Sequence, residues 1–356
     1  MKPVLFLTNH VPPDRVGAFQ ALHEAEPIEL GIYGGRLHHA VGGVQDPGVP
    51  FRGISQRDCF TLAASGRYRA VIATSAGRVA PLAAYAGARR ARVPFVYWTG
   101  IWAQIRTPAH LAAIPLTRAL ERRADAVVVY GSHVAGYVRG RGARNIHIAP
   151  QAVDAAFWSA PADPQAARRQ LGNPAFLALF AGRDVPGKGL GVLLDAWRSA
   201  GLPSDTALAL AGVAPSAEAT TTPGVHALGH LTPDQLRNFH AAADVLIVPS
   251  IPTRSFREPW GLVVNEAMHQ GTPVIATDAV GAAAGRLVRD GETGVIVPAR
   301  NPAALSSAIL RLRDDPSLRS RLGEAGRAAA AQQTFAAWAQ GFSDALGTIS
   351  SKGPSC

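Results

Sequence analysis

Hydrophobic residues in this chain gather in short runs of strand length, separated by stretches with the spacing of amphipathic helices. In the first half, the apolar runs occupy residues 3–9, 28–34, 70–75, 94–100 and 126–132. Helical patterns lie between them, as in residues 17–25 and 79–91. This alternation predicts βαβ units, which build a parallel sheet with helices on both faces. The runs are apolar throughout, as expected for strands that are buried on both sides.

A second series of the same kind follows in the other half of the chain. Its apolar runs occupy residues 177–184, 207–213, 244–250, 273–278 and 294–299. The stretch 146–160 between the two series has several prolines nearby and no helical period, and we interpret it as a linker. We therefore predict an α/β protein of two doubly wound domains, residues 1–152 and 153–335, with a cleft between them. A helix near residues 336–350 could return to the first domain, and residues 350–356 are predicted to lack regular structure.

Chain length and residue usage narrow the class of protein. A chain of 356 residues suits two domains. No apolar run approaches the roughly 20 residues that span a bilayer, and residues 1–10 resemble a first strand more than a secretion signal. The two cysteines, Cys59 and Cys356, argue against a disulfide framework or a cysteine metal cluster, and favour a reducing cytoplasm.

The net charge of +10 is concentrated in the first half of the chain. Residues 1–155 carry 18 basic and 9 acidic side chains, whereas residues 156–356 carry 17 and 16. Such asymmetry favours an anionic partner, for example a membrane surface, although a solvated arginine-rich surface explains it equally well. The segment 106–125 combines leucines with arginines and could rest on an anionic membrane, but Pro115 interrupts it and a helix buried on one face is the alternative. No nucleic-acid module is recognisable, so no nucleic-acid partner is expected.

Two glutamates flank a glycine turn in residues 257–278, REPWGLVVNEAMHQGTPVIATD. Gly261 precedes a predicted helix whose first free N–H groups favour an anion such as a phosphate. Glu266 lies about one helical turn beyond Leu262, which is about the distance from a diphosphate to the ribose of a nucleotide. A carboxylate there can accept hydrogen bonds from the two ribose hydroxyls. Glu258, on the other side of the glycine, could reach the sugar at the far end. Alternatively, both acids are ordinary surface groups.

Two further motifs suit a bound nucleotide. In residues 180–197 a strand ends at Gly182, and Arg183 and Lys188 flank a Pro-Gly turn, where two cations could neutralise a diphosphate; a plain surface turn is the alternative. In residues 226–250, Thr232 is predicted to cap a helix with Gln235 as its partner. The loop before that helix could contact a nucleobase through its backbone, although the histidine side chain in it is more simply an exposed one. This loop comprises Gly229, His230 and Leu231.

The order of these motifs resembles that of the retaining glycosyltransferases of family 4, which have the GT-B fold. The matching stretches are AGRDVPGKG, LGHLTPDQLRNFHAAADVLIVPS and the segment that begins EPWGLVVNEAMHQGTPVIATDAVGAAAG; upstream, DAVVVYGSHVAGYVRGRGARNIHIAPQAVDAAFW is similar to the end of that family's first domain. The resemblance covers about residues 120–340. Each motif alone is weak, and their combination is specific.

The resemblance implies a role for each matching residue. Arg183 and Lys188 would grip the donor diphosphate and act with Glu258, beside the anomeric carbon, as catalytic residues. Gly261 and Leu262 would bind phosphate through the backbone and Glu266 would bind the ribose, while Trp260 stands where the family usually has Phe. The other donor-binding candidates are Gly182, Gly229, His230 and Leu231. The second domain would hold the nucleotide-sugar donor, and neither a cofactor nor a metal is implied.

The first domain, which would bind the acceptor, matches less well. Many members have a Gly-Gly loop after the first strand, whereas this chain has NHVPPDRVGAFQAL. Arg15, Gly17 and Trp98 are the acceptor-binding candidates. The strand that often carries a histidine in that family reads FVYWTGIW, without one. The histidines that remain as candidates by position are His10, His110 and His133.

The expected function is transfer of a sugar from a nucleotide-sugar to a glycan or lipid-linked acceptor, in cell-surface polysaccharide assembly. The expected location is the cytoplasm, with membrane association on its cytoplasmic face as a further expectation. Two alternatives remain open: a nucleotide-sugar epimerase of the same fold, and an inactive GT-B partner that only binds.

Overall fold

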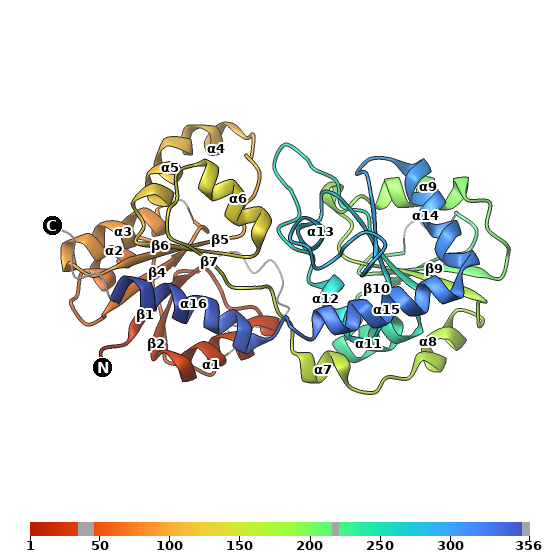
Figure 1. Cartoon of the computed structure of the whole chain (residues 1–356), viewed down its shortest axis with the longest axis horizontal. Helices are drawn as coiled ribbons and strands as arrows, with labels where there is room; N and C mark the ends of the chain where they lie inside the picture. Colours follow the sequence, from red (N-terminus) through yellow and green to blue (C-terminus); the bar gives the residue numbers. More distant parts are fainter. Residues whose placement is uncertain (35–45, 78, 216–220, 351–356) are drawn as a thin grey trace. The chain divides into compact units, whose positions relative to one another are not determined.

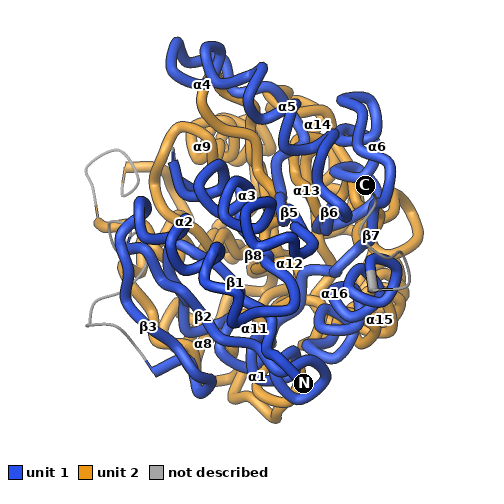
Figure 2. Tube along the Cα trace, turned by 90° about the vertical axis from the view of Figure 1, so that its left-hand side faces the viewer, with its two compact units in different colours: residues 1–154, 334–356 blue, residues 155–333 orange. Residues whose placement is uncertain are grey.

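A computed structural model describes residues 1–34, 46–77, 79–215 and 221–350 of the chain. The chain divides into two compact units (Figure 2). One comprises Met1–Asp154 with Thr334–Cys356, and the other comprises Ala155–Gln333. Residues 351–356, for which we predicted no regular structure, lie outside the described part.

The first unit is built on a seven-stranded sheet in the order β3-β2-β1-β4-β5-β6-β7. Its strands are β1 (Val4–Thr8), β2 (Ile28–Ile32), β3 (Phe51–Gly53), β4 (Ala70–Thr74), β5 (Phe95–Thr99), β6 (Ala126–Val129) and β7 (Ile146–Ile148). Neighbouring strands run parallel, and β1 is central, with Val4 beside Ile28 on one side and Ala70 on the other. The order reverses between β1 and β4, which is where ligands bind in such sheets.

Helices cover both faces of this sheet (Figure 1). They are η1 (Pro13–Arg15), α1 (Val16–Ala25), α2 (Asp58–Ala63), α3 (Ala80–Ala91), α4 (Pro108–Ala112), α5 (Ile114–Arg123), α6 (Ser132–Gly140) and α16 (Phe335–Ser350). Helices α1 and α16 pack on one face, where Phe6, Phe19 and Trp338 are buried together. Helices α2, α3, α5 and α6 pack on the other face. The last helix of the chain thus completes the core of the first unit.

The second unit is built on a six-stranded parallel sheet in the order β10-β9-β8-β11-β12-β13. Its strands are β8 (Phe176–Ala181), β9 (Thr206–Ala211), β10 (Val225–Gly229), β11 (Val245–Val248), β12 (Val274–Thr277) and β13 (Val295–Val297). Its helices are α7 (Ala155–Ser159), α8 (Pro164–Gln170), η2 (Pro186–Lys188), α9 (Leu190–Ser199), α11 (Pro233–Ala242), α12 (Val263–His269), α13 (Gly281–Ala284), α14 (Pro302–Asp314) and α15 (Pro316–Ala330). Helices α9 and α14 cover one face of the sheet, and α11 and α12 pack against β8, β11 and β12. The predicted α/β class with two doubly wound sheets is therefore confirmed.

The interpretation of residues 146–160 as a linker was wrong in part. Residues 146–148 form β7, which pairs with β6 at the edge of the first sheet, and residues 155–159 form α7. Both elements are short, so neither shows a clear period in sequence, and edge pairing and tertiary packing stabilise them instead. The predicted capping box at Thr232 and Gln235 is confirmed, because each side chain accepts a hydrogen bond from the other's backbone N–H.

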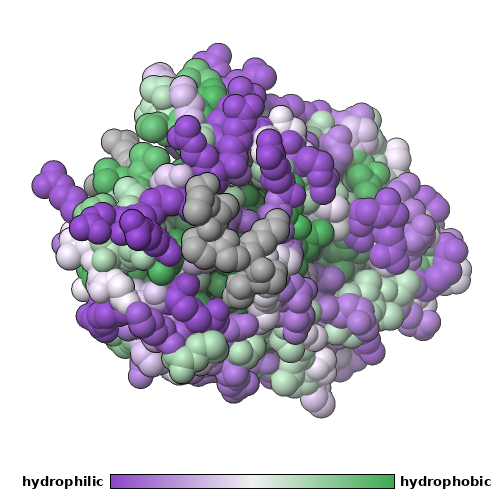
Figure 3. All heavy atoms as spheres, turned by 60° about the vertical axis from the view of Figure 1, so that its left-hand side comes forward, coloured by the Kyte–Doolittle hydropathy of each residue, from purple (hydrophilic) through white to green (hydrophobic). Residues whose placement is uncertain are grey.

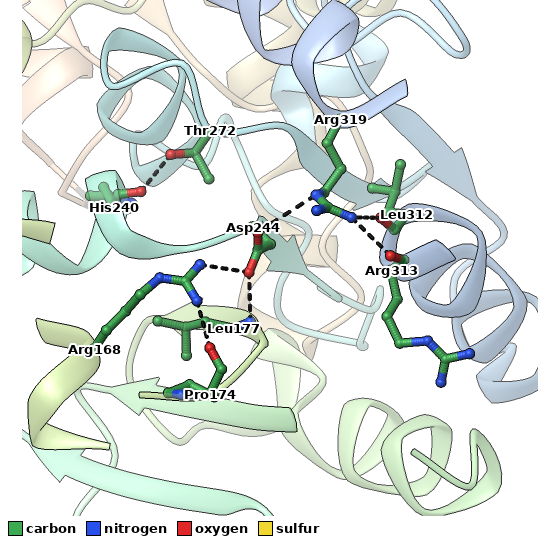
Figure 4. Close-up of polar contacts among 9 residues, drawn as sticks. All are labelled: Arg168, Pro174, Leu177, His240, Asp244, Thr272, Leu312, Arg313 and Arg319. Carbon is green, nitrogen blue, oxygen red and sulfur yellow. Dashed lines mark hydrogen bonds and ion pairs between the residues drawn. The ribbon is translucent and has the colours of Figure 1, made fainter. Parts of the chain in front are cut away.

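Asp244 fixes the amino end of β11, away from the edge where ligands bind (Figure 4). Its carboxylate accepts hydrogen bonds from the Leu177 N–H at 2.8 Å and from Arg168 at 2.7 Å. Arg319 lies 3.6 Å from the same carboxylate and donates to the carbonyls of Leu312 and Arg313 at the end of α14. One side chain thereby ties β8, β11, α8 and α15 together.

One face of the molecule carries many polar side chains. Figure 3 shows hydrophilic residues over much of the visible face, with hydrophobic ones in small patches between them. Among the described residues, no helix is both long enough and apolar enough to cross a membrane.

Candidate functional site

The second sheet reverses its order between β8 and β11, and the loops that follow these two strands carry the predicted catalytic residues. Lys188 follows β8 in the short helix η2, and Glu258 lies in the loop that follows β11. Because β8 and β11 are neighbours and run parallel, their carboxyl ends meet at one edge of the sheet. This topology brings together two residues that are far apart in sequence.

Lys188 and Glu258 form an ion pair in the structure. The Lys188 Nζ donates to the Glu258 Oε2 at 2.5 Å. The Ser250 hydroxyl, directly beyond β11, donates to the same carboxylate oxygen at 3.2 Å. The Glu258 side chain is only 8% exposed and that of Lys188 is 22% exposed. A buried carboxylate is thus held in place by one cation and one hydroxyl, a strong arrangement because both donors act on a desolvated charge.

Ser250 was not among the residues predicted from the sequence. Its carbonyl accepts a hydrogen bond from the Thr277 hydroxyl at 2.5 Å, which fixes the end of β11 against the end of β12. A small polar residue at the end of an apolar strand run is the signal that could have pointed to it, since such positions face the ligand edge of a parallel sheet.

The loop that carries Glu258 is held by the start of α13. The Gly281 N–H donates to the Glu258 carbonyl at 3.1 Å, and the Ala282 N–H donates to the Trp260 carbonyl at 2.8 Å. A methyl group at Gly281 would lie 1.9 Å from the carbonyl oxygen of Pro259. Only glycine permits this approach, so Gly281 fixes the position of the Glu258 backbone.

The turn between the two glutamates has a left-handed glycine. Gly261 has φ of +91°, a conformation that other residues adopt only with strain. Trp260, predicted to bind the donor, is buried, and its indole N–H donates to the Asn265 side chain at 2.7 Å. The indole therefore ties the turn to α12, and the half-buried Leu262 stands at the N-cap position of that helix without a side-chain capping bond.

Glu266 lies within α12 and contacts a histidine that the sequence did not single out. Its Oε2 is 3.4 Å from the Nε2 of His240, at the end of α11. His240 is fully buried, whereas the Glu266 side chain is 13% exposed. A histidine near the end of a predicted helix gives no sequence signal of this contact, because the contact depends on how two helices pack.

The other donor-binding candidates lie at the ends of β8 and β10. The Gly182 N–H donates to the Ala211 carbonyl at 3.0 Å and the Gly212 N–H donates to the Gly229 carbonyl at 2.7 Å, so three strands end side by side. Arg183 is exposed, and its guanidinium makes no ion pair with the residues that the structure describes. The two residues that follow Gly229 are an exposed His230 and a half-buried Leu231.

In the first unit, two of the three acceptor candidates meet. Arg15 is buried, donates to the Gln151 side chain, and its guanidinium carbon lies 6.0 Å from the ring centres of both Trp98 and Tyr130. Burial raises the pKa of Tyr130, so this phenol stays neutral beside the arginine. Gly17 lies in α1 close to the ring of Phe335.

The three candidate histidines of the first unit lie on different segments of the chain. His10 is half-buried beyond β1, and its carbonyl accepts a hydrogen bond from Thr8. His110 is exposed on α4 and pairs with Thr107, and His133 packs edge-on against Trp102. Within the described ranges, no group of three or more His, Cys, Asp or Glu side chains could hold a metal ion.

Comparisons with known proteins give a family match within the second unit. Residues 163–329 match the family model described as glycosyl transferases group 1. A D-inositol 3-phosphate glycosyltransferase of Streptomyces bingchenggensis is 37% identical over 46% of this chain and 39% of its own length. A phosphatidyl-myo-inositol mannosyltransferase of Mycobacterium leprae is 34% identical over 49% of this chain and 47% of its own length. The matched region thus spans less than half of each of these relatives.

Solved structures resemble the whole chain. HepE of Anabaena in complex with UDP has a TM-score of 0.78 and 20% identity, over 97% of this chain and 100% of its own. Sucrose-phosphate synthase from Thermosynechococcus elongatus has a TM-score of 0.76 and 20% identity, over 99% of this chain and 100% of its own. At this level of identity, the likeness shows a shared two-unit fold.

Proposed function

We propose that the chain is a retaining glycosyltransferase with the GT-B fold, because residues 163–329 match the family model of glycosyl transferases group 1 and solved structures share its fold. It would move a sugar from a nucleotide-sugar to a glycan or lipid-linked acceptor, in cell-surface polysaccharide assembly. The observation that carries this proposal is the Lys188–Glu258 pair at the reversal point of the second sheet. The UDP complex of HepE supports a nucleotide donor, and the lipid in the name of the Mycobacterium leprae relative supports a lipid-linked acceptor.

In the proposed reaction, Lys188 and Arg183 provide the positive charge that a leaving diphosphate needs. Arg183 is exposed and uncommitted to the ion pairs of the described residues, so its guanidinium can turn to phosphate oxygens without losing a partner. Lys188 is already beside Glu258, and a diphosphate would share its ammonium group. We propose that these two side chains, with no metal or other cofactor, neutralise the departing group.

Glu258 would position the donor sugar. Lys188 and Ser250 hold its carboxylate, and the Gly281 N–H at the start of α13 holds its backbone carbonyl, so the orientation of the side chain is set before the donor binds. The acceptor oxygen would form a bond to the anomeric carbon on the face from which the diphosphate leaves. The bond from that carbon to the phosphate oxygen breaks, its electron pair leaves with the diphosphate, and the proton of the acceptor hydroxyl passes to the departing oxygen. The configuration is retained because both events use one face.

The first test is thermal stabilisation by UDP, GDP, ADP and dTDP. A ligand present at about 100 times its dissociation constant stabilises the folded protein by about 2.7 kcal/mol, which a melting curve detects. We expect one of these nucleotides to stabilise the wild type and Glu266→Ala to abolish the shift. Glu324→Ala, which alters an exposed glutamate of α15 in the same unit, is the matched control and should keep it. If no nucleotide stabilises the wild type, the proposal fails and the inactive binding partner becomes the better interpretation.

A second test separates transfer from isomerisation. The protein is incubated with the sugar conjugate of the nucleotide that binds, without an acceptor, and the sugar products are separated. A transferase leaves the donor intact or slowly hydrolyses it, whereas an epimerase yields a second nucleotide-sugar. An isomerised product would refute transfer as the main activity.

We also propose that α4 and α5 contact an anionic membrane surface. Leu111 is 46% exposed and Leu116 is 50% exposed on these helices, although both are large apolar residues. A hollow of about 280 Å³ next to them is lined by Pro115, Arg118, Ala119, Arg122 and Arg123. Exposed leucines next to arginines suit the boundary between lipid headgroups and acyl chains.

Sedimentation with vesicles tests this contact. We expect the wild type to sediment with vesicles containing anionic lipid and to remain in solution with neutral vesicles. Arg118→Glu with Arg122→Glu should abolish sedimentation, whereas Arg311→Glu on α14 should not. Equal sedimentation of the double variant and the wild type would refute a role of α5.

A further inference from the structure

The carboxylate of Glu266 faces the edge of a buried histidine ring. Glu266 projects from α12 and His240 lies near the end of α11, and these two helices pack against each other. The His240 Nε2 is 3.4 Å from the Glu266 Oε2, a long hydrogen bond. The Glu266 side chain is 13% exposed, so it borders solvent, whereas the histidine behind it has no exposed surface.

Three contacts fix the position of His240. The Thr272 hydroxyl donates to the His240 carbonyl at 2.5 Å, which Figure 4 shows. The imidazole packs edge-on against Trp158, with ring centres 5.7 Å apart and an angle of 75° between the planes. The capping box at Thr232 anchors the other end of α11. The first and third of these contacts fix the backbone of α11, and the second packs the ring itself.

The surroundings of the ring determine which nitrogen carries the proton. The Nδ1 of His240 is buried and has no hydrogen-bond partner among the described residues. The Nε2 faces the Glu266 carboxylate, which accepts hydrogen bonds and cannot donate one when ionised. A proton on Nε2 therefore gives a hydrogen bond, whereas a proton on Nδ1 would have no acceptor, so we place the proton on Nε2. His240 then donates to one oxygen of Glu266. A carboxylate has about four acceptor positions, and the others remain for hydroxyl groups of a ligand.

We infer that His240 is a positioning residue that orients the Glu266 carboxylate toward the two ribose hydroxyls of a bound nucleotide. The inference rests on the proposed function, because it assigns Glu266 the ribose. His240 would not touch the nucleotide. It would restrict Glu266 to one rotamer, so less side-chain freedom is lost when the ribose binds.

Three variants separate positioning from packing. His240→Gln keeps a side-chain N–H near the place of Nε2, His240→Phe keeps the ring and its contact with Trp158 but removes the donor, and Glu266→Ala removes the acceptor. The measured quantity is the ratio of dissociation constants for 2′-deoxy-UDP and UDP, by calorimetric titration of the full chain. If GDP or ADP is the nucleotide that binds, the matching 2′-deoxy compound is used. This ratio reports the ribose contact and is insensitive to a general loss of stability.

We expect the wild type to prefer the ribonucleotide by about tenfold, as for one hydrogen bond to a charged group. Glu266→Ala should lose this preference, His240→Phe should lose most of it, and His240→Gln should keep it. The double variant should be no worse than Glu266→Ala, because the histidine acts only through the glutamate. An unchanged ratio in His240→Phe, together with a lower melting temperature, would show that His240 serves only packing.

A second measurement needs no nucleotide. In protein labelled with ¹⁵N-histidine, the His240 signals are assigned by their absence in His240→Phe. We expect the spectrum to show a proton on Nε2 and none on Nδ1, and Glu266→Ala to shift the Nε2 resonance. A proton on Nδ1 would overturn the inference even if nucleotides bind. Conversely, if no nucleotide binds while the His240 resonance responds to Glu266→Ala, the contact stands and the proposed function fails.

Discussion

Removing the positive charge of Lys188 should destabilise the second unit, because the buried Glu258 carboxylate would lose its cation. Lys188→Met keeps an unbranched apolar side chain of similar shape and removes the ammonium group with its charge and its hydrogen bond. Breaking a fully buried pair costs about 3–5 kcal/mol, whereas an exposed pair contributes at most about 1 kcal/mol. This pair lies between these limits, because Glu258 is 8% exposed and Lys188 is 22% exposed. Ser250 still donates to the carboxylate, so we expect a loss of about 2 kcal/mol.

The loss corresponds to a melting temperature lower by about 4–8 °C for a unit the size of Ala155–Gln333. Differential scanning calorimetry of the full chain measures it, and it can follow the two units as separate transitions. Glu258→Gln should cost less, since the ammonium group of Lys188 can turn to solvent. The double variant, Lys188→Met with Glu258→Gln, should be more stable than Lys188→Met alone, because it leaves no buried charge unpaired.

Two results would refute this reasoning. One is a melting temperature of Lys188→Met that equals that of the wild type. The other is a double variant whose loss equals the sum of the two single losses, since additivity means that the two side chains do not interact. Neither measurement requires a nucleotide or an acceptor, so the ion pair is tested independently of the proposed reaction.

Three further predictions concern the second unit. Gly281→Ala should lower the free energy of unfolding by about 1–3 kcal/mol and weaken nucleotide-sugar binding, because its methyl group would displace the carbonyl of Pro259. Urea unfolding measures the first effect and calorimetric titration the second. Unchanged binding would contradict the role of this contact. Asp244→Asn should also lower the free energy of unfolding by about 1–3 kcal/mol, because it weakens the hydrogen bond from Arg168. Nucleotide affinity should stay unchanged, since Asp244 lies at the opposite end of β11 from the candidate site. A change in affinity would contradict this prediction. Burial lowers the pKa of His269 in the folded protein, so the unfolded chain binds a proton at this imidazole more readily. The free energy of unfolding should therefore fall as the pH drops below about 6.5, and it should level off below the folded-state pKa. Urea unfolding at several pH values should show a shallower decline for His269→Gln, and an unchanged decline would refute the assignment.

The sequence predicted the parts of the fold that local pattern determines. The ten predicted apolar runs became β1, β2, β4, β5, β6, β8, β9, β11, β12 and β13, since buried parallel strands show their character without any partner. Strands β3, β7 and β10 and helix α7 were not predicted, because each is short and depends on its neighbours. The capping box at Thr232 was predictable, since all of its atoms lie within four consecutive residues.

The candidate site divides in the same way. Lys188 and Glu258 were predicted as separate cation and acid, but their ion pair could not be, because it depends on β8 and β11 being neighbours in the sheet. Ser250 and His240 were missed for the same reason. Each is of interest only because it contacts a glutamate on another element, Glu258 or Glu266. The roles predicted for these residues in donor binding stay predictions until a nucleotide is tested.

The return of α16 to the first unit has a consequence for synthesis on the ribosome. The second unit is one continuous segment, Ala155–Gln333, and can fold as soon as it has emerged. The first unit cannot be completed then, because Trp338 and Phe342 of α16 are still to be translated and their rings cover Phe6. The first unit therefore finishes folding only after the second unit has been made, because its apolar sheet face stays uncovered until α16 is available. Chaperones that recognise exposed apolar surface would bind the nascent chain at the sheet face that α16 later covers.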